Sequence, residues 1–300
     1  MPNFILQIHC GLILTKWKWL KHFWIILTGN AGLEAEMNEL LKRVLVAVVL
    51  IPIVLIVLYY RGLLLVISLL IVSFLGCLEY AQMMHKAGVK ISYVWVVFNS
   101  LFYLAFVYFQ GQELSLLWLV LFLAMGEAIL TWTKELSVPR LFATLFGFVY
   151  TALFPAMIVR IGLNYKEYNF LLALILLIWI VDSVAYFAGK KTGKHRNITA
   201  ISPQKSLEGF IAGILAPWLI LIILYISKVE IISFSYLALL AVASGIIGQI
   251  GDLVESMLKR FCNVKNSSHL LPGHGGILDR CDSILFAGSF LYCALEILLK

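Results

Sequence analysis

The stretch "YNFLLALILLIWIVDSVAYFA", residues 168–188, decides the class of fold. It contains one charged residue, Asp182, and its length matches the roughly 20 residues with which a helix crosses the hydrocarbon core of a bilayer. No polar face recurs at the helical period, as a helix on the surface of a soluble protein would require. The stretch therefore predicts a membrane helix, in which an ionisable group such as Asp182 is costly unless it is paired or functional.

Similar apolar runs recur along the whole chain of 300 residues, of which 62% are hydrophobic and 13% are charged. This composition lies far from that of a soluble domain. We predict an all-α polytopic membrane protein with about nine transmembrane helices and an active site at the cytoplasmic ends of the C-terminal helices. The runs are 44–60, 63–83, 92–109, 114–132, 141–163, 168–188, 207–227, 231–250 and 280–299.

The chain is predicted to have three parts. Residues 1–36 include "KWKWLKHFWIILTG", whose apolar core is too short for a membrane span, and we interpret them as an N-terminal extension or an interfacial segment. Met37 begins "MNELLKRVLVAVVLIP", which is typical of a start, so a chain beginning there is expected to stay active. Residues 37–165 are assigned to N-terminal transmembrane helices, and residues 166–300 to a C-terminal catalytic transmembrane region.

The net charge of +7 is better explained by membrane topology than by nucleic-acid binding. With nine spans, one side of the membrane carries fifteen Lys and Arg residues and the other only Arg61, Arg160, Lys166, Lys228 and Lys300. Lys and Arg concentrate on the cytoplasmic side, so we expect a cytoplasmic start and an external C-terminus. The two longest polar loops, 189–206 and 251–279, then share the cytoplasmic face and can meet. The fifteen are Lys42, Arg43, Lys86, Lys90, Lys134, Arg140, Lys190, Lys191, Lys194, Arg196, Lys205, Lys259, Arg260, Lys265 and Arg280.

The second of these loops, residues 251–279, and its flanking helices contain most of the candidate catalytic and binding residues. A helix over "GQIGDLVESMLKRF" would place Asp252, Ser256 and Lys259 on one face, at i, i+4 and i+7. The loop returns through "KNSSHLLPGHGGILDRCDS", where Asp279 and Asp282 open the last span. Capping of a membrane helix would explain these two acids alone. It does not explain why cations, His274 and a Gly pair accompany them.

The first loop offers a matching set of groups. In "VDSVAYFAGKKTGKHRNITAISPQKSLEGF", five cations follow Asp182, and Ser202, Lys205, Ser206 and Glu208 stand at the mouth of the next span. Lys190, Lys191, Lys194 and Arg196 are equally well explained as residues that orient the membrane helices.

Carboxylates beside cations at a membrane surface suit phosphoryl or nucleotidyl transfer. Mg²⁺ binds one or two protein carboxylates together with phosphate oxygens of the substrate, and cations neutralise the charge that develops on the phosphates. A Gly-rich turn lets backbone amides approach an anion. The intramembrane acids Glu79, Glu127 and Glu296 stand alone, and we expect each to pair within the helix bundle rather than to act in catalysis.

The stretch "SMLKRFCNVKNSSHLLPGHGGILDRCDS", residues 256–283, resembles the signature of the phosphatidate cytidylyltransferases, also called CDP-diacylglycerol synthases. The stretches "DSVAYFAGKKTGK" and "ISPQKSLEG" resemble other cytoplasmic segments of that family. One position departs from the pattern: Asn266 stands where the family has Asp after Lys265. Asn keeps an oxygen ligand but lacks the charge, which argues against a metal or base role at position 266.

The resemblance implies that CTP and phosphatidate react to give CDP-diacylglycerol and pyrophosphate. From their positions on the two arms of one loop, we choose Asp252 and Asp279 as Mg²⁺ ligands, with Asp282 and Asp182 as further ligands or neighbours of the ion. Lys259 and Arg260 suit the lipid phosphate. We assign the remaining substrate contacts to Lys205, Ser202, Ser206, His274, Gly275, Gly276, Lys265, Arg280 and Ser256.

Two alternatives remain open at the level of sequence. A CTP-dependent polyprenol or lipid kinase would transfer the γ-phosphoryl group, and a transporter would place broken half-helices in symmetry-related spans. The expected partners are CTP, phosphatidate and the lipid bilayer, without nucleic acid, and a homo-oligomer is compatible with the sequence. The expected location is the inner (cytoplasmic) membrane of a prokaryote, with the active site facing the cytoplasm.

Overall fold

The computed structural model describes residues 31–196, 201–227, 233–271 and 275–298. The chain divides into two units, Met1–Val49 and Leu50–Lys300. Throughout the described ranges the regular structure is helical, apart from two isolated β-bridges. The prediction of an all-α polytopic membrane protein is confirmed for this part of the chain.

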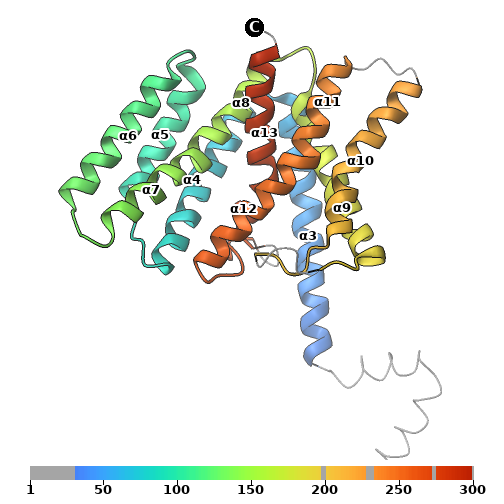
Figure 1. The fold of residues 1–300 in the computed structure, drawn as a ribbon, viewed down its shortest axis with the longest axis horizontal. Coiled ribbons are helices and arrows are strands. Elements are labelled where there is room, and N and C mark those ends of the chain that lie inside the picture. The colour runs from blue at the N-terminus through green and yellow to red at the C-terminus, as the bar shows by residue number, and fades with distance from the viewer. Residues whose placement is uncertain (1–30, 197–200, 228–232, 272–274, 299–300) are drawn as a thin grey trace, which may run out of the picture. The chain divides into compact units, whose positions relative to one another are not determined.

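The described helices follow the predicted apolar runs (Figure 1). Their bounds are α3 (Ala31–Tyr60), α4 (Gly62–Lys86), α5 (Val94–Tyr108), α6 (Glu113–Leu130), α7 (Ser137–Phe148), η1 (Val149–Leu153), α8 (Phe154–Asn164), α9 (Phe170–Thr192), α10 (Leu207–Ile226), α11 (Phe234–Val242), η2 (Ala243–Ile247), α12 (Gly248–Phe261) and α13 (Leu278–Leu298).

Seven helices of the described residues are long and apolar enough to cross a membrane. Two further apolar helices, Val44–Tyr60 and Val94–Tyr108, are shorter. At 1.5 Å per residue, a helix of 15 residues is about 22 Å long, less than the roughly 30 Å of a hydrocarbon core. The count of nine spans therefore stays a prediction. The seven are Gly62–Lys86, Glu113–Leu130, Ser137–Asn164, Phe170–Thr192, Leu207–Ile226, Phe234–Phe261 and Leu278–Leu298.

Two of these long helices contain a π-helical turn, η1 between α7 and α8 and η2 between α11 and α12. At η1, Pro155 lacks the N–H that would bond to the carbonyl of Thr151. That carbonyl accepts a hydrogen bond from Asn99 Nδ2 of α5 instead, at 3.4 Å. Single π-turns inside α-helices occur frequently at functional sites, and η2 directly precedes the segment that carries Asp252.

Helix α13 occupies the middle of the unit Leu50–Lys300. It packs against α4, α8, α9 and α12, and Figure 1 shows α5 and α6 to one side of it and α9 and α10 to the other. Small residues allow the close approaches that membrane helices need, because apolar side chains gain little by leaving lipid. A Cβ on Gly251 of α12 would lie 2.9 Å from the carbonyl oxygen of Asp282 in α13. This close contact brings the acids of the two helices together.

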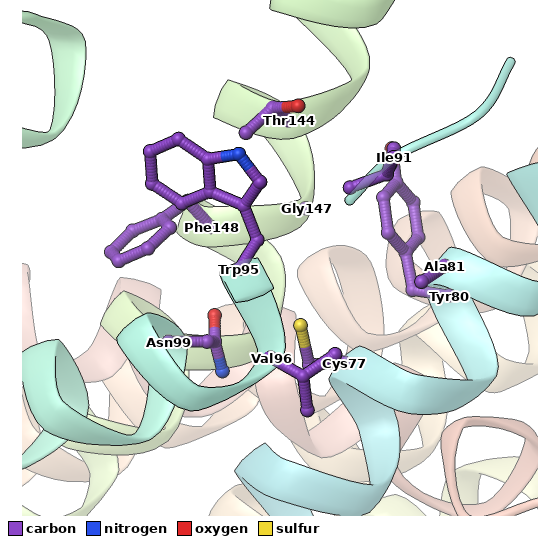
Figure 2. Close-up of a pocket in the computed structure, with 10 residues that line it drawn as sticks. All are labelled: Cys77, Tyr80, Ala81, Ile91, Trp95, Val96, Asn99, Thr144, Gly147 and Phe148. Carbon is purple, nitrogen blue, oxygen red and sulfur yellow. The ribbon is translucent and has the colours of Figure 1, made fainter. Parts of the chain in front are cut away.

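A small pocket lies away from the predicted site, between α4, α5 and α7 (Figure 2). Trp95 and Asn99 of α5 face Cys77 and Tyr80 of α4 across it. Its lining is mostly apolar and includes none of the predicted site residues. It is a packing feature of the N-terminal helices.

The approach of α13 to α8 at Gly288 yields a test of helix packing. A Cβ at this position would lie 2.5 Å from Cγ1 of the buried Ile158. Overpacking of this kind costs about 1–3 kcal/mol, so Gly288→Ala is expected to lower the thermal unfolding midpoint in detergent. Gly126→Ala is the matched control, since a Cβ on Gly126 of α6 has no atom within 4 Å. Equal midpoints for the two variants would contradict the packing of α13 on α8.

Candidate active site

The two polar loops meet at one end of the helices, as the sequence predicted. Nζ of Lys205, in the first loop, donates to Oδ2 of Asp252 in α12 at 2.6 Å. Nε of Arg260, at the end of α12, donates to the carbonyl oxygen of Ile201 at 3.2 Å. Figure 1 shows the α9–α10 connection and the α12–α13 connection at the same end, opposite the C-terminus.

Asp252 is the more open of the two predicted metal ligands. Its side chain and that of Lys205 are each 35% exposed. Oδ1 lies 3.4 Å from Oγ of Ser256, one helical turn further along α12. A long hydrogen bond and a half-exposed ion pair leave this carboxylate with acceptor capacity for a ligand.

Lys259 lies between two carboxylates. Its Nζ donates to Oε2 of Glu255 at 2.9 Å and to Oδ1 of Asp279 at 2.7 Å, and its side chain is 14% exposed. The helical spacing placed Lys259 on the face of Asp252, but the side chain turns toward α13. Asp252 is already paired with Lys205, and the buried carboxylates of Glu255 and Asp279 need a cation.

Asp279, in the first turn of α13, is held by protein donors on both oxygens. Oδ1 accepts from Lys259, and Oδ2 accepts from the backbone N–H of Ser267 (2.8 Å), from the backbone N–H of Gly276 (2.8 Å) and from the Ser267 hydroxyl (3.0 Å). The N–H groups of Ser267 and Gly276 precede α13, so Asp279 binds the connecting loop rather than capping the free N–H groups of its own helix. Together with the salt bridge to α12, these contacts join the loop to two helices.

The Gly pair shapes the turn that leads into α13. Gly275 has a φ of +87° and forms two backbone hydrogen bonds with Leu271, at 2.8 and 3.2 Å. A Cβ on Gly275 would lie 2.6 Å from Oδ2 of Asp279. A Cβ on Gly276 would collide with the hydroxyl of Ser267. Both positions therefore require glycine. His274, predicted to shape this turn, lies outside the described residues.

Two further carboxylates lie beside this centre. Asp182 of α9 interacts electrostatically with Asp252, Asp282 and Lys205, and Asp282 interacts with Asp252 and Glu255. Oδ1 of Asp282 also accepts the backbone N–H of Ser283 at 2.7 Å. The carboxylates of α9, α12 and α13 are therefore close enough to influence one another.

The donor chemistry fits a hard cation. Among the residues that the structure describes, no group of three or more His, Cys, Asp or Glu side chains could by itself hold a metal ion. Mg²⁺ does not need such a group, because it retains waters and binds substrate phosphates beside one or two carboxylates. A carboxylate-rich centre with oxygen donors only is compatible with that requirement.

The remaining predicted residues occupy several environments. Ser206 caps α10, where its Oγ accepts the backbone N–H of Gly209 at 3.1 Å. Lys265 is exposed, and its side chain forms no hydrogen bond or ion pair with any residue in the described ranges. Ser202 and Arg280 each interact with neighbouring groups. Asn266 is half-buried, and its Cβ would lie 3.6 Å from a Cβ built on Gly275.

Glu255 was not singled out in the sequence, and neither Glu208 nor Glu79 was assigned to the site, yet the structure places all three acids around it. Glu255 is buried against Lys259, and Glu208 binds Nδ1 of His195 at 2.7 Å and so organises the loop that carries Lys205. Glu79 was expected to pair within the bundle, yet its carboxylate accepts hydrogen bonds from residues of the segment 267–278. The signal available in the sequence was an isolated acid inside an apolar run.

Comparison with known proteins settles the family. The chain matches the model of the Cytidylyltransferase family over residues 41–298. It belongs to this family.

Among its relatives, the phosphatidate cytidylyltransferase of Haemophilus influenzae is 33% identical over 280 residues, which cover 83% of this chain and 96% of the relative. The enzyme of that name from Bacillus subtilis is 47% identical over 121 residues, and that from Staphylococcus haemolyticus is 42% identical over 125 residues. These two alignments cover 40% and 42% of this chain and 45% and 46% of the relatives, so the chain aligns with about half the length of each.

The geometry at Gly275 generates a prediction that separates backbone strain from crowding. Gly275→Ala combines a left-handed φ with a Cβ that displaces the Asp279 carboxylate. Gly111 has a similar φ of +83°, but a Cβ there has no atom within 4 Å. Both changes carry a backbone cost of roughly 1–2 kcal/mol. We expect Gly275→Ala to lower turnover at least tenfold more than Gly111→Ala, measured on folded protein in detergent. Equal turnover of the two variants would show that the turn does not position Asp279.

Proposed function

We propose that the protein is a phosphatidate cytidylyltransferase, which transfers CMP from CTP to phosphatidate and yields CDP-diacylglycerol and pyrophosphate. Membership of the Cytidylyltransferase family supports this proposal, as does the relative of that name that aligns along almost its whole length. The observation that carries it is the contact between Lys205 and Asp252. This contact joins a cationic loop to a carboxylate-bearing helix at one end of the membrane helices, where a lipid headgroup and a nucleotide can meet.

The reaction requires little acid–base chemistry from the protein. An anionic oxygen of the lipid phosphate forms a bond to the α-phosphorus of CTP, and the bond from that phosphorus to the oxygen bridging to the β-phosphorus breaks. Pyrophosphate leaves with this oxygen. The protein has to bring two polyanions together and neutralise the charge on the leaving group.

The cations of the site divide between the two substrates. Lys259 and Arg260, at the end of α12, are assigned to the lipid phosphate. Lys205, with Ser202 and Ser206 in the first loop, is assigned to the nucleotide phosphates. Further substrate contacts are assigned to Ser256, Lys265, His274, Gly275, Gly276 and Arg280.

Mg²⁺ would be held by Asp252 and Asp279, with Asp182 and Asp282 as neighbouring carboxylates. The ion supplies positive charge to the triphosphate when it binds. In this structure each of the two carboxylates contacts a lysine ammonium, at 2.6 and 2.7 Å, which the ion would displace from a carboxylate oxygen on binding. We place the protein in the inner membrane of a prokaryote, with this site facing the cytoplasm.

The first experiment uses radiolabelled nucleotides to test which phosphate is transferred to the lipid. Purified protein in detergent is supplied with phosphatidate and each of the four nucleoside triphosphates, with and without Mg²⁺. We expect label from the α-phosphate of CTP to enter the lipid, with release of pyrophosphate and dependence on Mg²⁺. Label from the γ-phosphate in the lipid would instead identify a lipid kinase, and no transfer from any nucleotide would favour a transporter.

The second experiment removes one charge at a time. Asp252→Asn and Asp279→Asn preserve shape but weaken cation binding, and each is expected to cost at least about 2–4 kcal/mol of transition-state stabilisation. The double variant should be little worse than either single variant, because the two groups act as one unit. Added Mg²⁺ should partly rescue the weaker single variant. Near-normal rates for both at limiting Mg²⁺ would place the ion at Asp182 and Asp282.

A further inference from the structure

The carboxylate of Glu79, on α4, is the anchor of a segment almost 200 residues away in the sequence. The residue is 4% exposed. Its Oε1 accepts hydrogen bonds from the hydroxyl of Ser268 (2.6 Å) and the backbone N–H of Ile277 (2.9 Å). Its Oε2 accepts from the hydroxyl of Ser267 (2.9 Å) and the backbone N–H of Leu278 (3.0 Å). Two donors come from residues 267 and 268 and two from the start of α13, and residues 272–274 between them lie outside the described residues.

The four hydrogen bonds match the acceptor capacity of one ionised carboxylate. A buried carboxylate on a membrane helix is costly unless its partners are complete. Two of the four donors are backbone N–H groups at the start of α13, where no intrahelical acceptor exists and the helix dipole favours negative charge. The interaction is therefore favourable for both partners, and it fixes the start of α13 against α4.

Glu79 and Asp279 contact some of the same residues. The Ser267 hydroxyl lies 2.9 Å from Oε2 of Glu79 and 3.0 Å from Oδ2 of Asp279, and its single proton serves one of them at a time. The backbone N–H groups of Ser267 and Gly276 also bind Asp279. A Cβ on Gly276 would lie 2.5 and 2.6 Å from the two oxygens of Glu79. The two carboxylates thus hold one segment from two sides, without space for an additional atom.

We propose that Glu79 is a positioning residue for the nucleotidyl transfer. It contacts neither the reacting phosphates nor the metal. It holds Ser267, Ser268 and the start of α13 so that Asp279 and the Gly275–Gly276 pair stand where the bound substrates need them. This inference rests on the proposed function. Displacement of catalytic groups by about 1 Å can cost roughly a hundredfold in rate, so an anchor of this kind is expected to affect turnover.

The test is Glu79→Gln in the full-length protein. An amide oxygen serves two of the four donors, and the amide NH₂ faces the others, so the segment should loosen. We expect hydrogen exchange at the amides of residues 277 and 278 to accelerate at least tenfold. Turnover should fall at least tenfold, and the Mg²⁺ concentration for half-maximal activity should rise at least threefold. A residue that only stabilised the fold would lower the melting temperature and leave that Mg²⁺ concentration unchanged.

Glu127→Gln is the matched control. It makes the same change in another helix, α6, where the carboxylate accepts from Nε1 of Trp95, outside the site. Exchange in the segment 267–278 and the half-activating Mg²⁺ concentration should both keep their wild-type values in this variant. An equal shift in both variants would overturn the inference.

A milder variant keeps the test decisive if Glu79→Gln does not fold. Ser268→Ala removes one of the four donors, and it should accelerate exchange and raise the half-activating Mg²⁺ concentration in the same direction by a smaller factor. Its control is Ser100→Ala, which removes a hydroxyl bonded to the carbonyl of Val96 in α5. Unchanged exchange, or faster exchange with unchanged kinetics, overturns the positioning role.

The experiments distinguish failure of the proposed enzyme activity from failure of the positioning role of Glu79. Failure of the enzyme activity would appear as a wild-type protein that forms no CDP-diacylglycerol from CTP and phosphatidate. The hydrogen-exchange comparison does not depend on that reaction. Normal exchange in Glu79→Gln would then overturn the anchor, and accelerated exchange at residues 277 and 278 would support it.

Discussion

The cost of holding carboxylates on membrane helices constrains the whole site. A charge in an apolar phase is tolerated when donors or cations surround it. Glu79, Glu255 and Asp279 are buried or nearly so, and each is bound by a lysine, by backbone N–H groups or by both. Because these donors come from different helices and from the connecting loop, satisfying the carboxylates also determines how α4, α12 and α13 meet.

Because of this constraint, the carboxylates of the site differ in how deeply they are buried and in how many hydrogen bonds they accept. Glu79 and Asp279 each accept several hydrogen bonds and act as fixed points, while Asp252 is half-exposed and bound by Lys205 and weakly by Ser256. A group with spare acceptor capacity can accept a ligand at lower cost than one whose hydrogen bonds are complete. The lysine that contacts it lies at an equally exposed position. The site therefore combines buried carboxylates that have several partners with a more exposed carboxylate that can accept a ligand, which suits the proposed nucleotidyl transfer.

Helix α13 links the carboxylates of the site to the packing of the helix bundle. Its first turn carries Asp279 and Asp282, and its body packs on α8 through Gly288 without space for a side chain. The N-terminal helices contribute more than a membrane anchor, because α4 supplies the carboxylate that receives the start of α13. The predicted catalytic region, residues 166–300, is therefore hydrogen-bonded to a residue of the N-terminal half.

The sequence by itself determined the helical membrane fold, because long apolar runs have few alternatives in a bilayer. It also singled out two polar segments that the structure brings into contact, since charged residues in so apolar a chain stand out by composition. Neither the partner of Lys259 nor the function of Glu79 was accessible in this way. Helical spacing places Lys259 beside Asp252, but the cation turns to Glu255 and Asp279, and Glu79 is an isolated acid whose donors lie 188 to 199 residues further along the chain. Only the tertiary structure decided these pairings, because local periodicity specifies the face of one helix and not the group from another helix that will meet it.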